Sequence, residues 1–185
     1  MIKILILDDS SIKIEAIKKV LFEGCGLSEE YVDVAESVSS GRKAVANDYY
    51  DIVLLDLVLP LFDYDEAVED GGLNFIREIS AAGETVKMPT QIIGLTEKED
   101  AYEKEKVEFE SLLFNVIVCR QKDSMWVQQL KQIVHYAIRS KSAILKSLQQ
   151  RRNFDIAVVC ALPEEFKQLI AAFGGENKWN NQSIE

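Results

Sequence analysis

The chain has 185 residues, of which 48% are hydrophobic, and a formal net charge of −10 at neutral pH. A hydrophobic share of this size is ample for a packed core, so a largely disordered chain is excluded. The excess of negative charge argues against a surface that follows phosphate groups and therefore against general nucleic-acid binding.

The first two thirds of the chain alternate between predicted strands and predicted helices. The strands are short apolar runs, at 2–7, 31–35, 52–55, 91–95 and 114–119. The helices between them fall at 11–23, 37–47, 72–81 and 98–111, the first capped by Ser10 or Asp9 and ended by Gly24 and Gly26. Five strand–helix repeats predict an α/β fold with a parallel sheet covered on both faces.

The fifth predicted helix is long, because nothing breaks it between Asp123 and about Arg152. Its apolar residues recur at alternating steps of three and four, which is the spacing of a coiled-coil seam. The seam runs through Val127, Leu130, Val134, Ala137, Lys141, Ile144 and Leu148. We therefore expect the second half of this helix to project and the helix 124–152 to form a homodimer.

Acidic side chains follow two of the predicted strands directly. Asp8 and Asp9 come after the first strand, and Asp56 comes after the third. The carboxyl ends of parallel strands form one edge of the sheet, where ligands bind in open α/β folds, so the three carboxylates should meet in one crevice. An all-oxygen site of this kind suits Mg²⁺, and a carboxylate beside that ion can accept a phosphoryl group.

These residues resemble the sequence motifs of a known family. The segments Leu7-Asp8-Asp9-Ser10, Val53 to Pro60 and Ile92-Ile93-Gly94-Leu95-Thr96 resemble, in order and spacing, the receiver domain of two-component response regulators over residues 1–124. The resemblance implies a flavodoxin-like fold with strand order 2-1-3-4-5. It also implies Asp56 as phosphoacceptor from a sensor histidine kinase, Thr96 as the switch hydroxyl, and a metal site formed by Asp9, Asp56 and the Val58 carbonyl with Asp8 in support.

The sequence departs from the family pattern beside the predicted phosphate. The family has Lys-Pro after the fifth strand, whereas this chain offers Arg120 or Lys122 as the phosphate-pairing cation and no proline. Glu97 follows Thr96 where the family favours a small residue. Two hypotheses remain open on these grounds: a phosphorylatable receiver, and a degenerate receiver that acts as a dimerisation or protein-interaction module without phosphorylation.

Residues 125–152 are predicted to link the receiver to a further domain. The segment 153–185 contains one apolar strand and one helix, too little to bury its own apolar surface, so we interpret it as the start of an effector domain. Its opening, Asp155 to Glu165, resembles that of the nucleoside phosphorylase and nucleosidase superfamily, which implies a catalytic role for Glu165. Nucleosidase activity is expected only of a longer chain.

Cysteine usage and the N-terminus bear on the compartment. Cys25, Cys119 and Cys160 are widely spaced and form no metal-binding pair, so reduced thiols are expected. The N-terminus lacks the architecture of a signal peptide, and no apolar run approaches the length that spans a membrane. We therefore predict a cytoplasmic protein without a membrane segment.

Overall fold

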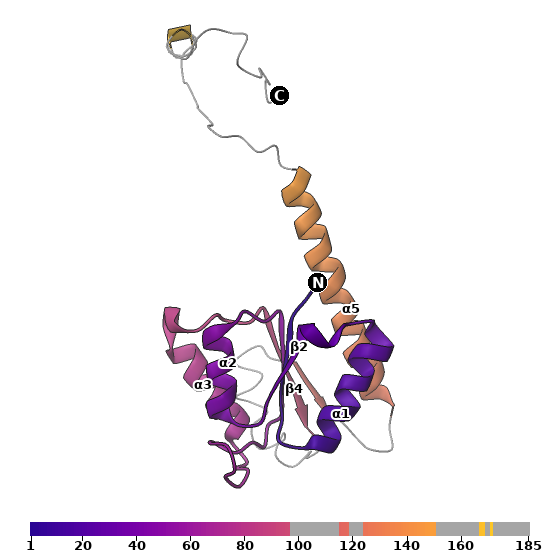
Figure 1. The fold of residues 1–185 in the computed structure, drawn as a ribbon, viewed down its shortest axis with the longest axis vertical. Helices are drawn as coiled ribbons and strands as arrows, with labels where there is room; N and C mark the ends of the chain where they lie inside the picture. The colour runs from indigo at the N-terminus through magenta and orange to yellow at the C-terminus, as the bar shows by residue number, and fades with distance from the viewer. Residues whose placement is uncertain (97–114, 119–123, 151–166, 169–170, 172–185) are drawn as a thin grey trace. The chain divides into compact units, whose positions relative to one another are not determined.

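A computed structural model describes residues 1–96, 115–118, 124–150, 167–168 and 171. Its centre is a parallel sheet of five strands in the order β2-β1-β3-β4-β5, which confirms the predicted flavodoxin-like topology (Figure 1). The strands are β1 (Ile4–Leu7), β2 (Val32–Ala35), β3 (Ile52–Leu55), β4 (Gln91–Thr96) and β5 (Asn115–Val118). The predicted strands therefore exist, each within two residues of its expected bounds.

Alternate residues of the central strands belong to two separate cores, one on each face of the sheet. Ile4 and Ile6 pack with Ile52 and Leu54 on one face, and the residues between them pack on the other. A strand buried on both faces reads as a continuous apolar run because its side chains alternate between the two faces. Both β1 and β3 are buried at every position.

Helices cover both faces of the sheet (Figure 1). On one face lie α1 (Ser11–Lys19), which continues as a π-helical turn over Val20–Gly24, and α5 (Met125–Gln150). On the other face lie α2 (Val38–Asn47) and α3 (Gly71–Ala81). Ser10 is the residue that caps α1, since its side chain accepts a hydrogen bond from the Lys13 backbone N–H.

The first half of α5 belongs to the core of the sheet domain. Leu130 and Val134 have no exposed surface and pack in the same core cluster as α1 and the central strands. These two positions of the predicted coiled-coil seam are therefore occupied within the domain and are not available to a second chain. Further along α5, Lys141 forms a 2.8 Å ion pair with Asp51, directly before β3, while Ile144 is 59% exposed.

The chain divides into two compact units, Met1–Ser147 and Leu148–Glu185. The predicted helix at 98–111 and the apolar strand that was expected to open the C-terminal segment both lie outside the described residues. Among the described helices, none combines the length and the apolar character needed to cross a membrane.

Candidate functional site

The register of the sheet places Asp8 and Asp56 side by side. Leu7 is paired with Leu55, so the residues that follow these two leucines leave adjacent strands at the same edge. The Asp56 backbone N–H donates a hydrogen bond of 2.8 Å to the Leu7 carbonyl, which extends the ladder by one step. The side chain of Asp56 is 13% exposed, so it is accessible from solvent at the end of a buried strand.

Three carboxylates meet at this edge. One oxygen from each of Asp8, Asp9 and Asp56 can be chosen so that all three lie within 4.8 Å of one another. Asp8 is buried, with 1% of its surface exposed, and its Oδ1 accepts a hydrogen bond of 3.0 Å from the Ser10 N–H. Asp9 is exposed. The predicted convergence of the two strand ends is thus present in the structure.

The neighbouring strand and the loop after β3 supply further predicted residues. Thr96 ends β4 and is fully buried, and Leu55 pairs with Gly94, two residues before it. Val58 is 9% exposed, and its N–H donates a 3.4 Å hydrogen bond to Asp56 Oδ1. Both residues therefore lie at the same edge of the sheet as the carboxylates.

A lysine outside the predicted set of site residues lies among the carboxylates. Lys13, in the first turn of α1, is 7% exposed, and its Nζ forms ion pairs of 2.8 Å with Asp8 Oδ2 and with Asp56 Oδ2. The same Nζ donates a 2.7 Å hydrogen bond to the Leu95 carbonyl at the end of β4. One ammonium group thus contacts β1, β3 and β4 at their carboxyl ends.

Burial and charge act in opposite directions on the two buried groups. Burial raises the pKa of Asp8 to about 6. The nearby Lys13 charge opposes this rise, and the Asp56 charge adds to it. Burial alone would lower the pKa of Lys13, but the carboxylates of Asp56 and Asp8 outweigh burial and raise it. Lys13 is consequently a cation at neutral pH, and it offsets part of the repulsion among the carboxylates.

The donor set fits a hard divalent cation. Each predicted side-chain ligand is a carboxylate oxygen, the type that Mg²⁺ prefers. Asp8 Oδ2 is buried, and its partner within the described residues is the Lys13 ammonium, 2.8 Å away. Three carboxylates share a single buried ammonium here, so a divalent cation beside them would offset the negative charge that remains.

The loop after β3 extends the acidic surface. Leu59 and Val68 form an antiparallel bridge that closes the loop between them. Asp63 in this loop accepts a short hydrogen bond from the Ser37 hydroxyl at the start of α2. A hollow of about 470 Å³ beside the carboxylates is lined by Asp9, Asp63 and Asp65, among other residues, so its polar groups also favour cations.

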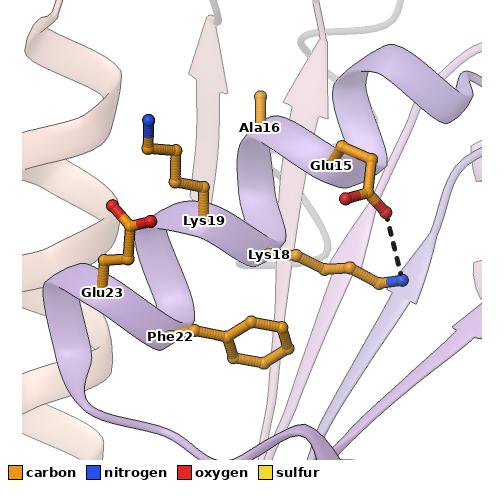
Figure 2. Close-up of a pocket in the computed structure, with 6 residues that line it drawn as sticks. All are labelled: Glu15, Ala16, Lys18, Lys19, Phe22 and Glu23. Carbon is orange, nitrogen blue, oxygen red and sulfur yellow. Dashed lines mark hydrogen bonds and ion pairs between the residues drawn. The ribbon is translucent and has the colours of Figure 1, made fainter.

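A second hollow, on the outer surface of α1, has a different character. Figure 2 shows its lining, Glu15, Ala16, Lys18, Lys19, Phe22 and Glu23, all from α1 and the π-helical turn after it. Its charged groups are of both signs, and Lys18 already pairs with Glu15 at 3.3 Å. None of the clustered carboxylates lines it, so the candidate site is the strand-end crevice.

Solved structures with the same architecture include response regulators and receiver domains. A two-component response regulator from Legionella pneumophila matches 74% of this chain and 99% of its own length, with a TM-score of 0.55 and 19% identity. The chain has the response-regulator receiver fold. The receiver domain of a sensor histidine kinase from Pseudomonas aeruginosa, solved with a magnesium ion coordinated in its active-site cleft, matches 74% of the chain with a TM-score of 0.51 and 19% identity over 97% of its own length.

Sequence comparison adds one curated relative. The uncharacterized protein y4jS of Sinorhizobium fredii is 27% identical over 168 residues, which is 86% of this chain. The chain spans 40% of the length of that relative. No family model matches the sequence.

The structure brings together Asp8, Asp9 and Asp56, and it places Thr96 at the end of the adjacent strand β4 and Val58 in the loop after β3. Arg120, Lys122, Glu97 and Glu165 lie outside the described residues, so their predicted roles stay predictions. Lys13 was missed, although the sequence held a signal for it. It stands four residues before Ile17 on the buried stripe of α1, where a charged residue needs a buried partner.

Proposed function

We propose that the chain is a phosphoacceptor module, phosphorylated at Asp56 by a sensor histidine kinase in a magnesium-dependent reaction. The observation that carries this proposal is the cluster of Asp8, Asp9 and Asp56 oxygens within 4.8 Å at the carboxyl edge of a receiver fold. Asp9, Asp56 and the Val58 carbonyl would hold the metal, with Asp8 in support. When bound, the metal would neutralise charge that develops on the transferred phosphoryl group.

The chemistry assigned to this chain is the attack of an Asp56 carboxylate oxygen on phosphorus. The bond from phosphorus to the imidazole nitrogen of the kinase phosphohistidine breaks, and its electron pair stays on that nitrogen, which takes a proton from solvent. The product is an acyl phosphate on Asp56. Hydrolysis by water later restores the carboxylate and releases inorganic phosphate, so the cycle closes without another reactant.

Phosphorylation would then shift the equilibrium between two conformations of a surface of the domain, and the Thr96 hydroxyl would link the phosphoryl group to that change. Its hydroxyl belongs to the strand next to β3 and is fully buried, so a shift toward a new phosphoryl oxygen would repack its surroundings. A C-terminal nucleosidase-like effector, controlled through α5, is the output we propose for a longer chain, consistent with a relative of which this chain spans 40%. A cytoplasmic location is part of the same proposal.

Beryllofluoride, which mimics an aspartyl phosphate, tests the phosphoacceptor assignment. Calorimetric titration in the presence of magnesium should show binding to the wild type and none to Asp56→Asn, which keeps the volume of the side chain and removes the nucleophile. Asp65→Asn is the matched control, because Asp65 is an exposed carboxylate in the nearby loop and no member of the cluster. A wild type that binds no beryllofluoride at millimolar magnesium would refute the proposal.

Exposed apolar residues on α5 support the second hypothesis, a degenerate receiver that acts as a dimerisation module. Tyr136 is 68% exposed, Ile144 59% and Leu145 47%, in a helix that buries Leu130 and Val134 against its own sheet. Ile144→Asp should lower the mass measured by light scattering, whereas Gln132→Asp, a change at an exposed polar position of the same helix, should not. A wild type that is already monomeric would end the dimer proposal, and a dimer without beryllofluoride binding would favour the degenerate module.

A further inference from the structure

We propose that Lys13, on α1, is the cation that pairs with the phosphoryl group on Asp56, in place of a cation from the end of β5. This inference rests on the proposed phosphorylation of Asp56. It assigns the role to a residue 43 positions before the phosphoacceptor, on a helix rather than after the last strand. Arg120 and Lys122, the two residues that the sequence offered, would then be dispensable for phosphate binding.

The direction of the helix explains how Lys13 reaches the site. Helical side chains point back toward the N-terminus of their helix, and the N-terminus of α1 follows directly from the carboxyl end of β1. The Ser10 hydroxyl caps this turn by accepting from the Lys13 N–H, which fixes the backbone of Lys13. A long side chain in the first turn is thereby directed over the strand ends.

The ammonium group is held by as many acceptors as it has protons. Asp8 Oδ2, Asp56 Oδ2 and the Leu95 carbonyl lie 2.8, 2.8 and 2.7 Å from Nζ. Lysine offers three donors and no acceptor, so this set can use its full capacity. With 7% of the residue exposed, the ammonium has little access to water, and its position is set by the protein.

The position of Nζ matches what a phosphoryl group on Asp56 would require. Nζ already touches a carboxylate oxygen of Asp56, so a phosphoryl group bonded to that carboxylate lies within reach of the same ammonium. The Leu95 carbonyl directly precedes Thr96, so Nζ lies beside the end of the strand that carries the predicted switch hydroxyl. A cation at this point can offset the added negative charge and hold the modified side chain toward β4.

A variant of Lys13 separates this role from a structural one. Removing the ammonium of Lys13 takes a cation away from Asp8 and Asp56, so Lys13→Gln should bind magnesium alone at least as tightly as the wild type. The same variant should bind beryllofluoride with magnesium at least about 30-fold more weakly, the loss expected when one partner of a buried charge pair is removed. A fold that is merely damaged would weaken both titrations together.

Three further variants complete the test. Lys18→Gln is the matched control, because Lys18 is on the same helix and, within the described part of the chain, pairs with the exposed Glu15 and with none of the clustered carboxylates, so both affinities should stay at the wild-type value. Arg120→Gln and Lys122→Gln should retain beryllofluoride binding. Wild-type affinity in Lys13→Gln, or a loss confined to Arg120→Gln or Lys122→Gln, would overturn the role of Lys13 and leave the phosphoacceptor intact. No binding by the wild type would refute both.

Discussion

Gly72, in the first turn of α3, is where a single added methyl group should strain the phosphoacceptor loop. A Cβ on Gly72 would lie 2.6 Å from the Asp56 carbonyl oxygen and 2.9 Å from the Leu57 Cα, both of them backbone atoms. The Gly72 N–H also donates a 2.9 Å hydrogen bond to the Leu57 carbonyl, so helix and loop are joined at this point. The clash in Gly72→Ala therefore cannot be relieved by rotating a neighbouring side chain.

The size of the effect follows from these distances. The backbone of Asp56 must move by about 0.8 Å, the difference between 2.6 Å and the 3.4 Å at which ordinary contact begins. Overpacking costs about 1–3 kcal/mol, and a clash with backbone atoms falls at about 2–3 kcal/mol because they cannot rotate away; replacing a helical glycine by alanine offsets about 1 kcal/mol of this loss. We expect Gly72→Ala to lower the free energy of unfolding by about 1–2 kcal/mol, measured by urea unfolding followed by circular dichroism.

Gly24→Ala provides the matched control for that measurement. A Cβ on Gly24 would also meet a close neighbour, but this neighbour is the end of the flexible Lys131 side chain, which can move aside. We expect no loss of stability in Gly24→Ala. A Gly72→Ala protein as stable as the wild type, with unchanged beryllofluoride affinity, would show that α3 and the Asp56 loop slide freely and would refute the reasoning.

Three further predictions concern the support of the sheet. Phe75→Ala should lower the free energy of unfolding by about 3–5 kcal/mol, because Phe75 has no exposed surface, and a loss below about 1 kcal/mol in urea unfolding would contradict its place in the core. Tyr50→Phe removes a 2.7 Å hydrogen bond to Asp33 and should cost about 1 kcal/mol at neutral pH. Burial raises the pKa of Asp33, but Tyr50 and Lys3 outweigh burial and lower it, so the stabilisation is present above the unfolded carboxyl pKa and is lost as the pH falls through the folded pKa. The stability difference between Tyr50→Phe and wild type should therefore shrink in acid, and a difference independent of pH would contradict this. Lys141→Met removes the 2.8 Å ion pair to Asp51 and should cost about 1 kcal/mol or less, with the difference reduced by salt; a salt-independent difference would argue against an electrostatic origin.

The convergence of Asp8 and Asp56 was predictable from sequence because it depends on local patterns. Continuous apolar runs end in carboxylates, and parallel strands in register bring those ends to one edge. The strands and most helices were equally predictable, since strands and helices each have an apolar pattern with a characteristic period. These features hold whichever other parts of the chain pack around them.

The surface against which α5 packs could not be predicted from the same kind of pattern. Spacings of three and four residues describe a coiled-coil seam and also the face of a helix that packs on its own sheet. The structure places Leu130 and Val134 in the core of the sheet domain and leaves Ile144 exposed. Which surface covers an apolar stripe is decided by the partners available in three dimensions, and periodicity alone does not name them.

The strand–helix alternation and the carboxylates of the candidate site follow from the sequence alone, and the strand order follows from the family resemblance. The identity of the cation that contacts these carboxylates depends on tertiary packing. Lys13 is distant in sequence from Asp56 and Leu95, and its Nζ contacts both because α1 packs on one face of the sheet with its first turn close to the carboxyl ends of the strands. A charge in the first turn of an amphipathic helix is normally solvated, and its burial depends on acceptors that other strands supply.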